Sequence, residues 1–87
     1  MVPVSIPSQL TSYTDGATRV EAKGATVDAV LHDLDARYPG LRFRVVDEQD
    51  RIRRHIRIFV NRKQVYDLGR ALQAGDRVQI LQALSGG

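Results

Sequence analysis

One amphipathic helix between alternating segments is the sequence feature that most constrains the fold of this chain. Thr26 is a suitable N-cap, because its hydroxyl can accept a hydrogen bond from the first-turn amides, and Asp28 follows at the positive end of the helix dipole. Pro39-Gly40 ends the segment. Between these signals, apolar residues recur at helical spacing at Val27, Val30, Leu31, Leu34 and Tyr38. Such a stripe has to be buried against another layer of structure.

The segments on both sides of this helix alternate between apolar and polar residues, which is typical of half-buried strands. Strands are expected at residues 2–6, 18–22, 55–60 and 77–81. Residues 61–64 are typical of a hairpin turn that leads into a short strand at Val65 and Tyr66. These elements predict an α+β domain over residues 1–81, a mixed sheet of four to five strands with one main helix packed on one face. Residues 82–87 are expected to form a flexible C-terminal tail.

The remaining segments carry weaker patterns. Residues 41–54 are polar and irregular apart from Phe43, Val45 and Val46, and they are expected to form a brief strand or a loop that covers the core. Residues 67–73 are expected to hold one helical turn. Turns are predicted at residues 11–16, 23–25 and 74–76.

The composition excludes several classes of function. The 87 residues include no cysteine, which excludes disulfides, thiolate metal sites and a cysteine nucleophile. We see no apolar signal-peptide region and no run of roughly 20 apolar residues, so a cytoplasmic protein without membrane contact is expected. His32 and His55 have no convincing acid–base or ligand partner, and Asp33 and Asp35 lie two positions apart on a helix, where side chains do not face each other. Neither a catalytic site nor a metal site is predicted.

The net charge of +3 is unevenly distributed along the chain. Residues 1–40 carry three basic and five acidic side chains, whereas residues 41–87 carry ten basic and five acidic side chains. A solvated face is the main interpretation of the densest cluster, and steering of an acidic protein partner or a polyphosphate substrate stays open. Nucleic-acid binding is not favoured, because no known reading motif accompanies the charge. The cluster consists of Arg51, Arg53, Arg54 and Arg57.

The diglycine end at Gly86 and Gly87 is the strongest functional signal in the sequence. An average glycine usage of about 7% makes such a pair at a given end a chance event of roughly 0.5%. Glycine has no Cβ, so such an end can pass through a narrow channel and bring its carboxylate into the active site of another protein. A frayed end without function is the alternative.

The order of the elements and the diglycine end resemble the ThiS/MoaD family of small sulfur carriers, which have a ubiquitin-like β-grasp fold. The resemblance covers nearly the whole chain. It is carried by Gly24-Ala25-Thr26-Val27, Tyr38-Pro39-Gly40-Leu41, Ile58-Phe59-Val60-Asn61, Ala74-Gly75-Asp76-Arg77 and the tail. Val4-Ser5-Ile6-Pro7 and the long insertion at residues 41–55 look most like carriers that serve cysteine biosynthesis. Small subunits of molybdopterin synthase are the next most similar group.

The resemblance implies chemistry at Gly87. An adenylating enzyme of the ubiquitin-activating type would use ATP and magnesium to convert the Gly87 carboxylate into an acyl-adenylate, and a sulfur donor would displace AMP to leave a thiocarboxylate. The carrier itself would bind no cofactor. The acceptor would be a cysteine synthase or the large subunit of molybdopterin synthase. Gly86 and Ser85 would thread into the partner, and Leu84 would either anchor the tail there or pack on its own domain. A ubiquitin-like modifier that is conjugated through Gly87 is the alternative, because the same adenylate serves both.

A partner surface is predicted on the sheet face that points away from the helix. Strand alternation sends Arg57, Phe59, Arg77 and Leu81 to that face if their neighbours point inward. Similar carriers place the two strands side by side, which would gather Phe59 and Leu81 into an apolar spot with arginine at its rim. Aromatic and arginine side chains are favoured interface anchors. The alternative is that residues 41–55 cover Phe59.

Overall fold

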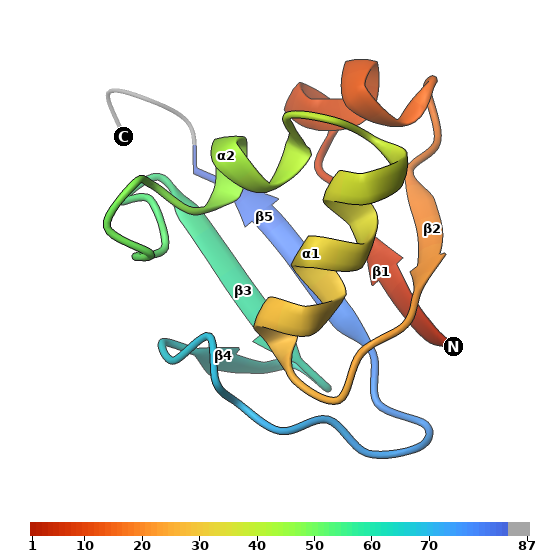
Figure 1. The fold of residues 1–87 in the computed structure, drawn as a ribbon, viewed down its shortest axis with the longest axis vertical. Helices are drawn as coiled ribbons and strands as arrows, with labels where there is room; N and C mark the ends of the chain where they lie inside the picture. Colours follow the sequence, from red (N-terminus) through yellow and green to blue (C-terminus); the bar gives the residue numbers. More distant parts are fainter. Residues whose placement is uncertain (84–87) are drawn as a thin grey trace.

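The structure, a computed structural model, describes residues 1–83 of the chain. A five-stranded mixed sheet forms one layer, and the helices lie together on one of its faces (Figure 1). The strand order is β2-β1-β5-β3-β4. This is the α+β architecture that the sequence predicts. The strands are β1 (Val2–Ser5), β2 (Arg19–Ala22), β3 (Ile56–Val60), β4 (Lys63–Val65) and β5 (Val78–Gln82).

The main helix, α1 (Val27–Arg37), forms as predicted. The Ala29 N–H donates to the Thr26 hydroxyl at 3.1 Å, which confirms the N-cap. The stripe of Val27, Val30, Leu31 and Leu34 is buried against the sheet, with no residue more than 1% exposed. Burial of this stripe is the main contribution of α1 to stability, because short helices are marginal on propensity alone.

Strand β5 lies at the centre of the sheet. It pairs in parallel with β1 and antiparallel with β3, where Ile58 faces Ile80 and Val60 faces Val78. The four side chains of these two pairs are at most 1% exposed and pack beneath the helices. A strand bonded on both sides has no free backbone edge, so its course through the sheet is well determined.

The segment after α1 differs from the expectation of a strand or loop. It forms a second short helix, α2 (Leu41–Val45), and a loop continues from it to β3. Leu41 and Val45 lie four positions apart and are fully buried, whereas Phe43 is 52% exposed, with the Arg53 guanidinium 4.5 Å from its ring centroid. The expectation was wrong because residues four positions apart lie on one face of a strand and also on one face of a helix. The spacing of Leu41 and Val45 therefore fits both structures.

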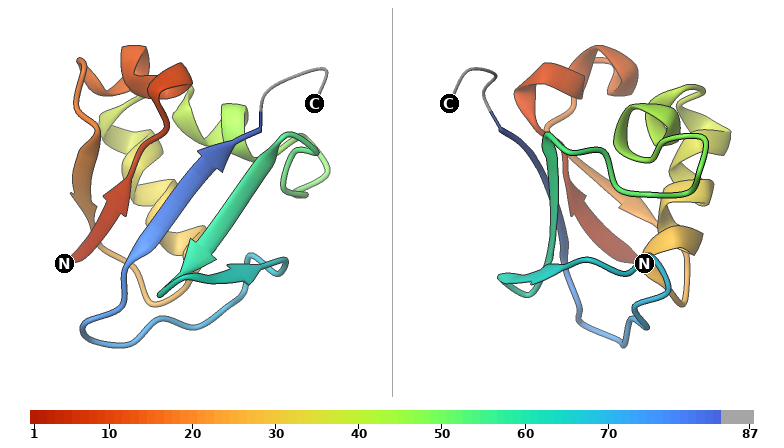
Figure 2. Two further views of the ribbon diagram at one scale, coloured as in Figure 1. Left: turned by 180° about the vertical axis from the view of Figure 1, so that it is seen from behind. Right: turned by 90° about the vertical axis from the view of Figure 1, so that its left-hand side faces the viewer.

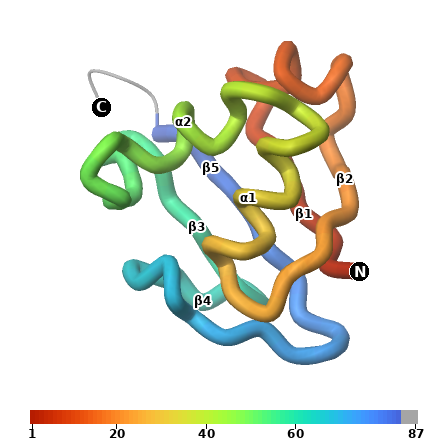
Figure 3. Tube along the Cα trace, in the orientation of Figure 1, coloured from red at the N-terminus to blue at the C-terminus, as the bar shows by residue number. Residues whose placement is uncertain are grey.

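One further expectation was confirmed in part, and another was wrong. A turn was predicted at residues 11–16, but residues 11–14 belong to a 3-10 helix, η1 (Ser8–Thr14). This helix ends at Asp15, which has a left-handed backbone with φ of 54°. Residues 67–73 form no helical turn. Instead, the carbonyls of Leu68 and Arg70 accept hydrogen bonds from the Asp28 and Val27 N–H groups, at 2.9 and 3.1 Å. The segment therefore satisfies first-turn amides of α1, beside which it passes in Figure 3.

The hairpin between β3 and β4 is tighter than predicted. Asn61 and Arg62 alone form the turn, with φ of 51° and 72°, so β4 already begins at Lys63. Tyr66 lies beyond the strand and is 79% exposed.

Within residues 1–83, none of the helices has the length and apolar character that crossing a membrane requires.

Candidate functional site

The carboxyl end of β5 is where the chain leaves the sheet towards Gly87. Gln82 pairs with Ile56, and the Ala83 N–H donates to the His55 carbonyl at 2.7 Å, so pairing continues two residues beyond the predicted domain boundary at residue 81. This end of β5 lies at the same edge of the sheet as α2 and η1 (Figure 2). The predicted tail residues Leu84, Ser85, Gly86 and Gly87 lie outside the described residues.

Phe59 and Leu81 lie on the outer face of the sheet, as predicted. In the register of β3 and β5, Phe59 faces Gln79 and Arg57 faces Leu81, which makes Phe59 and Leu81 diagonal neighbours. Leu81 is 41% exposed and Phe59 is half-buried. The helices and the 46–55 loop lie on the other side of the sheet (Figure 2), a placement that does not support the alternative in which residues 41–55 cover Phe59. The pair forms an apolar spot, which we call the Phe59–Leu81 spot.

The two arginines that were expected at the rim of this spot lie at its two ends. Arg57 borders Leu81, and its guanidinium donates to the carbonyls of Arg54 and Ile56 at 2.8 and 3.2 Å. Arg77 lies at the other end of β5, where its backbone N–H donates to Asn61 Oδ1 at 3.0 Å. Because Phe59 faces Gln79, Arg77 is the other diagonal neighbour of Phe59, so the register places one arginine beside each end of the apolar spot. A role of these residues in partner binding stays a prediction.

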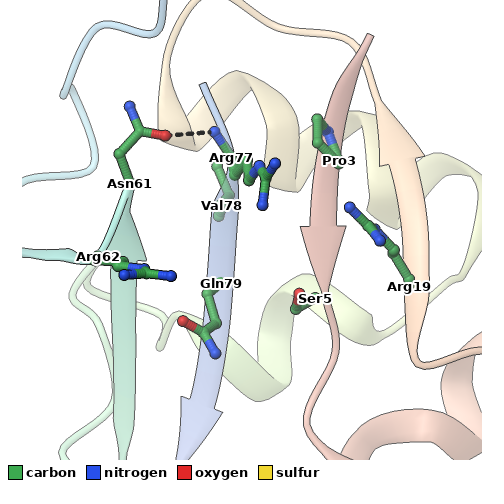
Figure 4. Close-up of a pocket in the computed structure, with 8 residues that line it drawn as sticks. All are labelled: Pro3, Ser5, Arg19, Asn61, Arg62, Arg77, Val78 and Gln79. Carbon is green, nitrogen blue, oxygen red and sulfur yellow. Dashed lines mark hydrogen bonds between the residues drawn. The ribbon is translucent and has the colours of Figure 1, made fainter. Parts of the chain in front are cut away.

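Arg77 also lines a pocket of about 430 Å³ at the start of β5. Arg19 of β2 and Arg62 of the hairpin also line it, together with Pro3, Ser5 and Gln79 of the sheet (Figure 4). Our sequence interpretation missed Arg19 and Arg62, because these arginines lie far apart in the chain and become neighbours only through the strand order. Alternation places Arg19 on the outer face, and this was the one signal available for it.

The two histidines are exposed residues in different segments of the chain. His32 Nε2 lies 3.4 Å from Asp28 Oδ2, four positions earlier on the exposed side of α1, and His55 is exposed at the start of β3. Within residues 1–83, no three His, Asp or Glu side chains are grouped closely enough to hold a metal ion.

The acidic residues of α1 have structural contacts. Asp33 accepts a hydrogen bond from the Lys23 backbone N–H at 3.0 Å and pairs with Arg37 at 3.1 Å. The first of these contacts lowers the pKa of Asp33 below its usual range, and burial works against it. Asp35 accepts from the backbone N–H groups of Gly40 and Arg42. These contacts tie α1 to the loops at its two ends.

The family of the chain follows from its comparison with known proteins. The model of the ThiS family matches residues 4–87. This chain belongs to the ThiS family. The sulfur carrier protein CysO of Mycobacterium tuberculosis is 40% identical to this ThiS-family chain over 91 residues, which cover 99% of this chain and 98% of that protein.

Solved structures agree with this membership. A chain in the crystal structure of the Amycolatopsis orientalis BexX/CysO complex matches this ThiS-family protein over all of both chains, with 39% identity and a TM-score of 0.92. SAMP1 from Haloferax volcanii matches with 29% identity and a TM-score of 0.78, over 99% of this chain and 98% of that one. These matches confirm the ubiquitin-like β-grasp fold.

Proposed function

We propose that this chain is a sulfur carrier that holds sulfur as a thiocarboxylate on Gly87 and delivers it in cysteine biosynthesis. The observation that carries the proposal is the 40% identity to the sulfur carrier protein CysO over 99% of the chain. The diglycine end supports the chemical part, because the Gly87 carboxylate is the group that would be activated.

Activation requires a partner, since a carboxylate is a poor electrophile. In the proposed reaction, a Gly87 carboxylate oxygen attacks the α-phosphorus of ATP in the active site of an adenylating enzyme, and pyrophosphate leaves. Sulfide sulfur from a donor then attacks the acyl carbon, and AMP leaves with the bonding electron pair. The product is a thiocarboxylate, so one oxygen of Gly87 has been replaced by sulfur. ATP and magnesium belong to the partner in this scheme, and the carrier binds neither.

The position of β5 in the sheet suits this role. Gln82 is still paired with Ile56, so the described part of the chain holds the tail's starting point in place. Five residues then lead to Gly87, and a chain of five residues spans at most about 18 Å. The carboxylate could therefore enter a deep active site while the domain stays outside. Tethered sulfur also reacts at a high effective concentration with an acceptor that binds the same domain.

The partners in this proposal are the adenylating enzyme and a sulfur-accepting synthase. A solved relative of this chain comes from a BexX/CysO complex, which supports the idea that such carriers act bound to another protein. The Phe59–Leu81 spot is the surface we assign to these contacts. It lies on the face that the helices leave open, near the end of β5 from which the tail departs.

Mass spectrometry tests the proposal directly. The purified chain is incubated with an adenylating enzyme of its own genome, ATP, magnesium and sulfide. The expected result is the mass gain of one oxygen replaced by sulfur, located at Gly87 by fragmentation. The control is the chain without Gly86 and Gly87, which should give an unchanged far-UV spectrum and no mass gain. Sulfur transfer by this shortened chain would overturn the proposal.

A protein modifier is the second candidate, and the match to SAMP1 favours it. A related structure, at 25% identity, is named as the small archaeal modifier protein 1 of Methanosarcina acetivorans. In the same incubation, a cell extract that contains the adenylating enzyme would then yield protein-sized adducts joined through Gly87 to lysine side chains. Thiocarboxylate without such adducts would favour the carrier.

A further inference from the structure

The pocket at the start of β5 collects three arginines from three separate elements. Arg19 comes from β2, Arg62 from the turn between β3 and β4, and Arg77 from the residue before β5. In Figure 4, the side chains of Arg19 and Arg77 point towards one another beside Pro3, and the side chain of Arg62 points towards β5. Three guanidinium groups thus surround one open hollow on the outer face of the sheet.

None of these three arginines forms an ion pair within the described residues. The arginines of residues 1–83 that form ion pairs are Arg37 and Arg42, on the helix side of the sheet. Asp76 lies near the pocket, but its carboxylate accepts from the Asn61 side chain and the Gln73 backbone N–H. Three like charges that face one hollow repel each other, and an anion placed between them removes that repulsion.

The backbone of Arg62 is a second, independent observation. Arg62 is the second residue of a two-residue hairpin turn and has a φ of 72°, a position at which glycine is strongly preferred. Asn61 has a clear structural role in the same turn, since its side chain accepts from the Arg77 N–H and donates to Asp76. The Arg62 side chain forms no hydrogen bond or ion pair with residues 1–83. Arg62 thus has an unfavourable backbone angle, and its side chain makes no contact that would stabilise the fold. Such residues are concentrated at functional sites, so this observation points to a functional role of the Arg62 side chain.

We propose that Arg19, Arg62 and Arg77 bind carboxylates of an acidic segment in a partner protein. The planar fork of arginine matches a carboxylate with two parallel hydrogen bonds. Ser5 and Gln79 add a hydroxyl and an amide as neutral donors at the same pocket. The open hollow and the net charge of +3 suit an extended acidic chain that lies across the sheet.

The position of the pocket favours a protein over a free small anion. Gln79 faces Ser5 on one side and Phe59 on the other, so the pocket and the Phe59–Leu81 spot are continuous on one face. A protein that covers the spot therefore also reaches the arginines. The tail departs from the opposite end of β5, about 16 Å away for a five-residue strand. The arginines thus act in docking, separately from the reaction proposed at Gly87.

An NMR titration of the full chain tests this inference, with an acetylated and amidated hexaglutamate peptide as the probe at low salt. The amide signals of Ser5, Arg19, Arg62 and Gln79 are expected to shift, and added sodium chloride should reverse the shifts. Arg62→Gly and Arg77→Gln should each raise Kd about two- to fivefold, the effect of losing one exposed charge pair. Arg62→Gly suits the turn, so it removes the charge without endangering the fold.

The matched control is Arg44→Gln, which removes one exposed charge from α2 on the other side of the sheet. It should leave Kd unchanged. Equal affinity of the wild type and both pocket variants would overturn the proposal. Inorganic phosphate that causes the same shifts at an equal or lower concentration would replace it with a small-anion site. Deletion of Gly86 and Gly87 should not change peptide affinity, so this test can fail or succeed independently of the proposed sulfur transfer.

Discussion

Substitution of Gly24 by alanine should destabilise the domain more than an ordinary loop substitution. Gly24 follows β2, where the chain passes against the first turns of α1. A Cβ at this residue would lie 2.6 Å from the Val30 amide nitrogen, 2.8 Å from the Ala29 carbonyl carbon and 2.9 Å from Ala29 Cβ. Favourable contacts between such atoms lie near 3.5–4.0 Å. Two of the three atoms belong to the helix backbone, so no side-chain rotation can relieve the overlap.

The expected cost follows from two opposing effects. Forcing an extra methyl group into a packed region typically costs about 1–3 kcal/mol. Alanine also restricts the unfolded chain more than glycine does, which returns about 0.4–1 kcal/mol. We therefore expect the free energy of unfolding to fall by about 1–2 kcal/mol, and Tm to fall by about 5–15 °C for a domain of this size.

Urea unfolding followed by far-UV circular dichroism measures this difference. The matched control is Gly69→Ala, where the added Cβ would meet only the Asp67 side chain, at 3.3 Å or more. This contact is with an exposed side chain and not with backbone, so the control should lose no stability, and the restriction of the unfolded chain should add about 0.4–1 kcal/mol. If Gly24→Ala is as stable as the wild type, then the loop moves away from α1 at no cost, and the packing argument fails.

Three further predictions concern stability. Thr26→Ala removes the hydroxyl that accepts from the Ala29 N–H, and should cost about 1 kcal/mol in urea unfolding, whereas Thr26→Ser should recover most of it. Leu31→Ala empties a fully buried position and should cost about 2–5 kcal/mol by calorimetry, with a smaller loss contradicting the packing of α1 on the sheet. The hydrogen bond from the Gln73 backbone N–H lowers the pKa of Asp76 in the folded protein. The Asp76 carboxylate therefore stabilises the fold at any pH above its pKa in the unfolded chain, which is about 4. This contribution is lost as the pH falls through the lower pKa of the folded state. Urea midpoints measured below about pH 4 should therefore depend less on pH in Asp76→Asn, and equal pH dependence would contradict this assignment.

The elements that could be predicted are those with local signals. The N-cap at Thr26, the stop at Pro39-Gly40 and the stripe between them identify α1, because each signal acts within one or two turns of the chain. Helix α2 was missed because five residues are too few to show a helical period. Its buried pair, Leu41 and Val45, forms a helix because it packs against α1 and η1, and that contact is not local.

The outer and inner faces of the strands also follow from alternation, since successive side chains point to opposite faces of a sheet. Alternation by itself therefore assigns Phe59 and Leu81 to the outer face. The strand order depends on hydrogen bonds between segments far apart in the chain, which no local pattern encodes. That order brings Arg19, Arg62 and Arg77 to one pocket next to the Phe59–Leu81 spot. Local chemistry thus specified the helix, the faces and the glycine end, whereas long-range pairing selected which charged side chains became neighbours.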